Sequence, residues 1–73
     1  MKFNVGDKIK IVKPLIRMGR NHVGSVGEVL EHRCYSHRYV GNKPTHYVVK
    51  FDCYKRSHIY MRFEIEDSCD KIE

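Results

Sequence analysis

The sequence predicts a small all-β domain built as a closed barrel. The chain has 73 residues, which suffices for one domain with a small core. Short segments with strand character recur along it, and Gly6, Gly24 and Gly27 punctuate them. Short strands joined by glycine-containing turns are typical of small barrels. We therefore expect little interior space for a catalytic pocket and place any function in the loops.

The first predicted strand begins at Lys8 and ends at Pro14. Ile9 and Ile11 share one face of it, and Lys8 and Lys10 share the other. This alternation indicates a half-buried strand, and Pro14 ends it because proline cannot donate a hydrogen bond to a neighbouring strand. We expect the isoleucines in the core and the lysines in water.

The second predicted strand covers Val23–Glu31. Val26 and Leu30 are in phase along it, whereas Val29 is not. A β-bulge at Gly27 would allow both sets of side chains to be buried, because the extra residue of a bulge shifts the alternation of the strand.

The segment His32–His46 has no clear periodicity and is too long for a plain loop in so small a domain. We expect it to extend the second and third strands into a hairpin with its turn near Gly41-Asn42. The third strand, Tyr47–Asp52, has Tyr47, Val49 and Phe51 on one face.

The fourth predicted strand is His58–Phe63, after a basic turn over Tyr54–Ser57. Its alternation places Ile59, Met61 and Phe63 inward and His58, Tyr60 and Arg62 outward. A short closing segment around Ile65 follows. The domain is expected to span residues 1–66, and residues 67–73 to form a frayed acidic C-terminal tail.

Charge is distributed unevenly along the chain. The formal net charge is +5, but the segment from Lys8 to Arg62 holds twelve basic residues against three acids, and Glu64–Glu73 holds five acids against one lysine. This asymmetry predicts a basic body, which attracts phosphates or an acidic partner, and an acidic strip that folds back on it and competes with a ligand. A soluble surface of mixed charge is the simpler interpretation.

Three segments together resemble a known family. Gly6–Val12, Gly24–Val29 and Tyr47–Asp52 are similar to the small Src-homology-3-like (SH3-like) barrels of the KOW type, which occur in ribosomal proteins and transcription elongation factors. The resemblance covers about residues 3–66. It implies a five-stranded barrel whose loops contact RNA, DNA or another protein. The extended hairpin between strands 2 and 3 has no counterpart in the minimal pattern.

Aromatic and basic residues alternate in that hairpin and again around the fourth strand. Nucleic-acid surfaces use both types, because cations neutralise phosphates and flat rings stack on bases. The predicted binding residues, with those of the loop after Pro14, are Arg17, Arg20, His22, Arg33, Tyr35, His37, Arg38, Tyr39, Lys55, Arg56, Tyr60 and Arg62. The plainer interpretation is that the tyrosines cap a thin core and the arginines keep the chain soluble.

Nucleic acid is the first choice of partner, and a larger protein is the alternative. Tyrosine and arginine are also enriched at protein interfaces, so an accessory or viral factor that modulates a transcription or nucleic-acid-processing enzyme predicts the same composition. We expect a monomer.

Other classes of function fit the sequence less well. Cys34, His37, Cys53 and His58 meet the ligand types of zinc, but no Cys-x-x-Cys pair supports a metal site. Cysteine chemistry at Cys34 or Cys53 lacks a pocket and an orienting acid, so we expect neither an enzyme nor a cofactor. The three cysteines without a signal peptide or a membrane-length apolar run indicate a cytoplasmic protein with reduced thiols.

Overall fold

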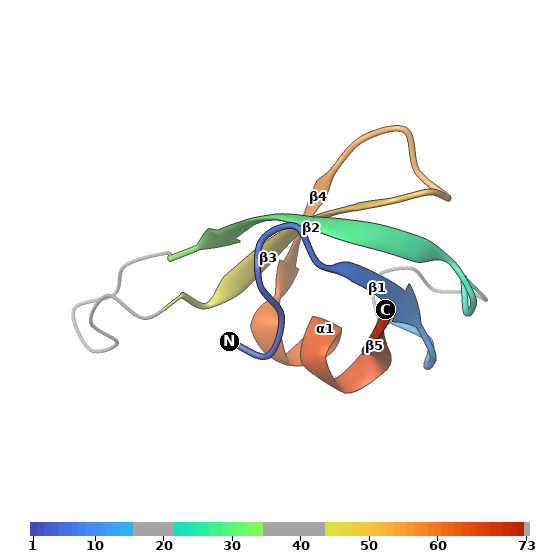
Figure 1. Ribbon diagram of the computed structural model, residues 1–73, viewed down its shortest axis with the longest axis horizontal. Helices are drawn as coiled ribbons and strands as arrows, with labels where there is room; N and C mark the ends of the chain where they lie inside the picture. The colour runs from blue at the N-terminus through green and yellow to red at the C-terminus, as the bar shows by residue number, and fades with distance from the viewer. Residues whose placement is uncertain (16–21, 35–43, 73) are drawn as a thin grey trace.

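The computed structural model describes residues 1–15, 22–34 and 44–72, and within them five strands form one antiparallel sheet beside a single short helix (Figure 1). The strands are β1 (Lys8–Ile11), β2 (Val26–Arg33), β3 (His46–Phe51), β4 (His58–Met61) and β5 (Cys69–Ile72). The helix α1 (Arg62–Ser68) joins β4 directly to β5. The prediction of a mostly β fold is confirmed.

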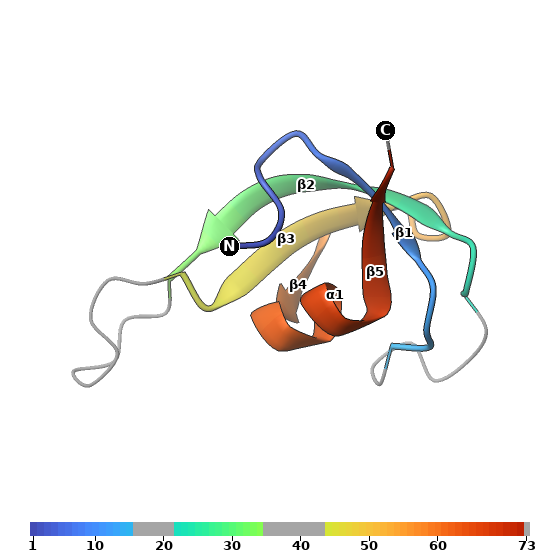
Figure 2. The same cartoon turned by 60° about the horizontal axis from the view of Figure 1, so that its bottom comes forward.

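The sheet is open and strongly curved. Its strand order is β4-β3-β2-β1-β5, so β4 and β5 form the two edges. In a flat sheet, four strand spacings would separate these edges by ~19 Å. The 7-residue helix that joins them spans only ~10 Å. The edges therefore curl toward each other, and α1 lies under the concave side of the sheet (Figure 2).

The residues predicted to face the core from β1 and β3 are confirmed. Ile9 and Ile11 are fully buried, and the lysines beside them are exposed. Tyr47, Val49 and Phe51 are likewise fully buried. These side chains form the centre of the core, because strands β1 and β3 present one apolar face each to the inside of the curved sheet.

The second strand lies further along the chain than predicted. It covers Val26–Arg33, with Val29 fully buried and Leu30 43% exposed. The irregularity falls between Val29 and Glu31, not at Gly27. A glycine is needed at position 27 for a different reason. A Cβ there would lie 2.5 Å from Cδ1 of Phe51, so only glycine leaves room for that ring.

Strands β2 and β3 extend toward the predicted hairpin. Their pairing continues to Arg33 opposite His46, and Thr45 N donates to Arg33 O across 2.9 Å. The extension of the two strands is thus confirmed over the described residues. The turn predicted near Gly41-Asn42 lies outside them.

The predicted phase of the fourth strand is wrong. Tyr60 is buried, while Met61 is 39% and Phe63 58% exposed. The strand ends at Met61 and the helix begins at Arg62, so the period of the chain changes from two residues to 3.6. The Tyr60 ring, packed edge-on against Phe51 with centroids 5.5 Å apart, fills the interior instead.

The C-terminal segment is part of the sheet and is not a frayed tail. Strand β5 pairs with β1 from Lys8 opposite Ile72 to Ile11 opposite Cys69, and Cys69 is buried. The carbonyl of Ser68 accepts from Val12 N and Lys13 N. Because its backbone completes the sheet, this segment is not available as a loose competitor for a ligand.

The N-terminal segment is tied to α1 by a buried tyrosine. The Tyr47 hydroxyl donates to Glu66 Oε2 across 2.6 Å and accepts from Phe3 N at 3.1 Å. Lys2 N also donates to Glu66 Oε2, at 2.9 Å, and His32 Nε2 lies 2.7 Å from Phe3 O. We call Phe3, His32, Tyr47 and Glu66 the Tyr47 cluster.

Burial and hydrogen bonds shift two acidities in the Tyr47 cluster. Burial, with the hydrogen bond to Glu66, raises the pKa of Tyr47 to about 12. Burial alone would raise the pKa of Glu66, but hydrogen bonds from Tyr47, Lys2 and Arg62 outweigh it and lower that pKa. Both shifts favour a neutral tyrosine donating to a charged carboxylate.

The only helix in the described part of the chain, α1, is neither long nor apolar enough to cross a membrane.

Candidate functional site

The loop between β3 and β4, residues 52–57, is held in a defined turn. Tyr54 N donates to Phe51 O across 3.1 Å. The Lys50 ammonium group donates to Phe51 O at 2.9 Å and also to Tyr54 O. Lys50 therefore holds the carbonyls of Phe51 and Tyr54, and with them the backbone that carries the Tyr54 ring.

Four aromatic rings follow one another from this loop into the core. The centroids are 5.5 Å apart for His22 and Tyr54, 5.1 Å for Tyr54 and His58, and 6.3 Å for His58 and Tyr60. These separations are in the range of favourable ring contacts. His58 is exposed, His22 and Tyr54 are partly buried and Tyr60 is buried. We call these four residues the ring row; its outer members offer ring surface to solvent.

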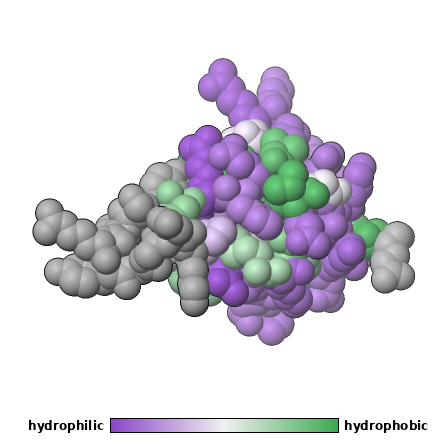
Figure 3. All heavy atoms as spheres, turned by 60° about the vertical axis from the view of Figure 1, so that its left-hand side comes forward, coloured by the Kyte–Doolittle hydropathy of each residue, from purple (hydrophilic) through white to green (hydrophobic). Residues whose placement is uncertain are grey.

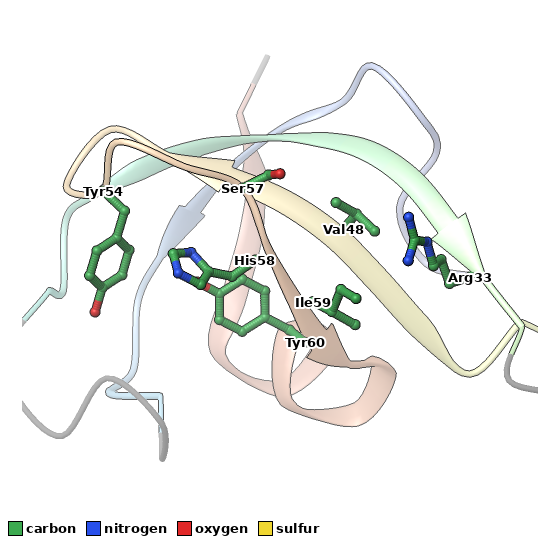
Figure 4. Close-up of a pocket in the computed structure, with 7 residues that line it drawn as sticks. All are labelled: Arg33, Val48, Tyr54, Ser57, His58, Ile59 and Tyr60. Atoms are coloured by element: carbon green, nitrogen blue, oxygen red, sulfur yellow. The ribbon is translucent and has the colours of Figure 1, made fainter.

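An open groove of about 600 Å³ accompanies the ring row along β4. It is lined by Arg33, Val48, Tyr54, Ser57, His58, Ile59 and Tyr60. Figure 4 shows Tyr54 and Arg33 at opposite ends of this set, with His58, Tyr60 and Ile59 between them. The groove thus combines rings, an aliphatic wall and one cation.

The groove follows β4, an edge strand of the sheet that the described residues form. Arg62 N donates to Thr45 O across 2.9 Å, and Tyr60 stands opposite Tyr47 further along the same ladder. In an antiparallel pair, residues that bond to the neighbouring strand alternate with residues whose backbone groups point away. Ile59 is of the second kind, so its N–H and C=O point out of the edge of β4, along the groove.

The electrostatic environment of the groove is basic. Among the described residues that line it, none is acidic, and Arg33 is exposed at one end. Lys55 and Arg56 are exposed in the loop at the other end. Glu31 partly offsets Arg33, since the two side chains form an ion pair of 3.0 Å. The face drawn in Figure 3 is largely hydrophilic, with hydrophobic residues in small separate spots.

The structure brings some of the predicted binding residues together. Lys55 and Arg56 lie in the loop beside the ring row, which His22 and Tyr60 belong to, and Arg33 lines the groove. The predicted residues Arg17, Arg20, Tyr35, His37, Arg38 and Tyr39 lie outside the described residues.

Two predicted residues have a different setting from the one expected. Tyr60 is only 3% exposed, so it closes the inner end of the ring row and offers little ring to a ligand. The Arg62 guanidinium pairs with Glu66 on α1, with Nε 3.2 Å from Oε2. Its charge is therefore shared with a carboxylate.

The predicted binding residues do not include His58, Ser57 or Lys50, whose ammonium group holds the turn. Tyr54 belongs to the aromatic and basic set predicted around the fourth strand, and His58 is predicted to face outward, but only the fold brings their rings together. A signal was present in the order Tyr54, His58, Tyr60, with rings at both ends of one short turn and strand. The contribution of Lys50 depends on the turn geometry and has no sequence signal.

The four-ligand zinc arrangement considered from the sequence does not form around both cysteines. Cys34 comes directly after β2 and lies near the first residue of β3, whereas Cys53 comes after the last residue of β3. The 6 residues of β3 therefore separate the two cysteines by ~20 Å. Within the described ranges, no group of three or more potential ligands could hold a metal ion. Burial raises the pKa of the third cysteine, Cys69, to about 12, so its thiol is protonated at neutral pH.

Comparisons of the chain with protein-family models, with curated proteins and with solved structures found no match.

Proposed function

We propose that this protein is a binding module for nucleic acid, without catalytic activity, and that the β3–β4 loop with its groove is the contact surface. The observation that carries the proposal is the ring row beside Lys55 and Arg56. Phosphates are bound by exposed cations and bases by exposed rings, and this loop supplies both within a few residues.

The fold proposal is a partly open SH3-like barrel of the KOW type. The support is the five-stranded antiparallel sheet, its strong curvature and the short helix that joins its two edges. Such a barrel keeps its strands for the core and leaves its loops for binding. The fold by itself does not specify the ligand, so the groove carries the functional argument.

A protein-binding regulator is the second candidate, and one observation favours it. Met61 and Phe63, at the end of β4 and the start of α1, are both exposed. Exposed aromatic and methionine side chains next to an edge strand suit a protein partner.

A binding measurement at several salt concentrations tests the first candidate. Nucleic-acid affinity that depends on phosphate contacts falls steeply with salt, with a slope of about 0.7 to 0.9 per contact. The double variant Lys55→Gln/Arg56→Gln is expected to weaken binding and to reduce the slope by about 1.4 to 1.8. The matched control Lys10→Gln/Lys13→Gln removes the same charge from the exposed side of β1 and the residues after it.

Equal loss in the two double variants would mean that net charge, not this loop, attracts the ligand. If no nucleic acid binds even at low salt, the first candidate is wrong. A pull-down from extract then tests the second candidate: a stoichiometric protein that is retained after nuclease treatment and lost in the variant Met61→Ser/Phe63→Ser supports it.

A further inference from the structure

We infer that the ligand of the groove is a single strand, and that one unpaired base stacks on the rings of Tyr54 and His58 while its edge meets the backbone N–H and C=O of Ile59, which point away from β3. This inference rests on the proposed function and narrows it to one class of nucleic acid. It uses three features of the groove that phosphate binding alone does not need: its rings, its size and the edge strand β4.

The rings favour a base over a phosphate. Tyr54 and His58 meet edge to face, at an interplanar angle of 60° with centroids 5.1 Å apart, so their planes form a corner. A corner of two rings offers one face for stacking and one edge for lateral contact. A phosphate gains nothing from such a corner, whereas the π-face of any base does.

The size of the groove suits one nucleotide. Its volume of about 600 Å³ lies in the usual range for small-ligand sites. Val48 and Ile59 stand opposite each other in the β3–β4 ladder and add apolar side chains to the lining, on the other face of β4 from His58 and Tyr60. A base in a duplex keeps both faces covered by its neighbours, so duplex DNA or RNA cannot place a base here without unpairing it.

The backbone of β4 supplies polar partners for the edge of the base. The N–H and C=O of Ile59 point away from β3, so one donor and one acceptor are offered side by side. A base edge presents a donor and an acceptor in a similar arrangement once it is unpaired. Stacking thus supplies affinity and the strand edge holds the base in register.

The charges around the groove select against a cationic ligand. Aromatic rings in a groove also suit methylated amines, but such sites gain from a nearby acid, and none lines this groove in the described part of the chain. Arg33 at one end and Lys55 and Arg56 at the other instead fit a polyanion whose backbone enters and leaves along β4.

The test compares three labelled probes by fluorescence anisotropy at one salt concentration. They are single-stranded oligothymidine of about twelve nucleotides, the same backbone with abasic sites, and the duplex with oligoadenosine. The single strand is expected to bind about tenfold more tightly than the other two, which is the effect of stacking about one base. A ribouridine probe of equal length extends the comparison to RNA.

Variants locate the stacked base. His58→Ala removes an exposed ring and is expected to abolish most of the preference for the single strand. Tyr54→Leu is expected to do the same, and Tyr54→Phe, which keeps the ring, to retain it. Because Tyr54 packs partly against the core, thermal unfolding is measured for each variant, and His58→Ala decides the question if Tyr54→Leu does not fold.

The outcomes separate this inference from the proposed function. Equal binding of all three probes would overturn the inference and leave nucleic-acid binding intact, while no binding of any probe would overturn both. A preference for single strands that persists in His58→Ala and Tyr54→Leu would place the base elsewhere. In NMR spectra the Ile59 amide is expected to shift on addition of oligothymidine, and an unmoved Ile59 signal contradicts the placement along β4.

Discussion

The Tyr47 cluster and the ring row use the same residue types for different purposes. Each combines tyrosine with histidine rings at centroid distances of 5–6 Å. In the Tyr47 cluster the polar atoms have internal partners: the hydroxyl lies between Phe3 N and Glu66, and His32 meets Phe3 O. In the ring row the contacts are between ring faces and edges, and His58 is exposed.

This difference shows which tyrosines are candidates for function. A tyrosine whose hydroxyl and ring are both satisfied inside the protein contributes to stability, because removing it leaves buried groups without partners. A ring that packs on one side and meets solvent on the other remains available to a ligand. Composition alone does not separate the two cases, since Tyr47 and Tyr54 both lie among basic and aromatic neighbours in the sequence.

The largest expected effect is on stability, from Tyr47→Phe. This change removes only the hydroxyl, leaves Phe3 N without its acceptor and is expected to cost about 1–3 kcal/mol. Urea unfolding measures the loss, and oligothymidine affinity is expected to stay unchanged. Weaker binding in a folded Tyr47→Phe protein would show that the Tyr47 cluster and the ring row are coupled.

The same variant has a distinct alkaline signature. The pKa of Tyr47 is raised from 10.0 to about 12, so its contribution to stability is complete below pH 10 and is lost as the pH rises toward 12. Wild type is expected to lose more stability than Tyr47→Phe over this interval. Parallel pH profiles for the two proteins would contradict the hydrogen-bonded neutral tyrosine.

The next effect concerns Glu66 at acid pH. Its folded pKa is lowered from 4.5, so its contribution is complete above the unfolded value and is lost as the pH falls through the folded pKa. Wild type is expected to lose more stability between neutral pH and pH ~3 than Glu66→Gln does. Thermal unfolding followed by circular dichroism at matched ionic strength measures this difference. If wild type and Glu66→Gln lose the same stability at acid pH, the protonation of Glu66 does not affect folding.

A smaller effect is expected from Lys50→Met, which acts on the other region. It removes two hydrogen bonds that fix the turn, at a cost of about 1 kcal/mol, and is expected to weaken oligothymidine binding because Tyr54 loses its position. Lys10→Met, an equal charge change on β1, is the control. If Lys50→Met and Lys10→Met bind oligothymidine equally well, the hydrogen bonds of Lys50 are not needed to position Tyr54.

The smallest effect is expected from Arg62→Ala. Its ion pair with Glu66 is solvent-exposed on the arginine side, and such pairs contribute about 0.3–0.5 kcal/mol. The salt slope of nucleic-acid binding is expected to change less than in Arg56→Ala, because Arg62 already has an anionic partner. A larger change in Arg62→Ala would move the contact surface from the β3–β4 loop toward α1.

The sequence predicted the strands whose burial follows a simple alternation. In β1 the buried isoleucines alternate with exposed lysines, and in β3 Tyr47, Val49 and Phe51 are fully buried on the core face, although Val48 on the other face is also buried. The pattern misled at the end of β4, where Ile59, Met61 and Phe63 alternate in the sequence but Arg62 begins a helix. Alternation is then no longer the relevant period, and Glu64, Ile65 and Ser68 become the buried positions of α1.

Long-range pairing was the other part that the sequence did not reveal. The acidic residues of 64–73 suggested a solvated strip, and nothing local shows that Asp70 stands opposite Lys10. The kind of site could be predicted from the sequence, because Lys55 and Arg56 lie next to aromatic residues in the chain. The corner of Tyr54 and His58 and the outward backbone of Ile59 were not, because both depend on how β4 pairs with β3.

The pairing of β5 with β1 has a consequence for how the chain acquires its structure. Residues Lys8–Ile11 meet Cys69–Ile72, so this ladder closes a loop of roughly 60 residues. Contacts at such separation in sequence slow the search for the native state, and β-rich domains of this kind fold in milliseconds to seconds. Docking of β5 is thus expected to be a late event, after the β2–β3 hairpin has provided a template, and α1 would order in the same step because it lies between the two sheet edges.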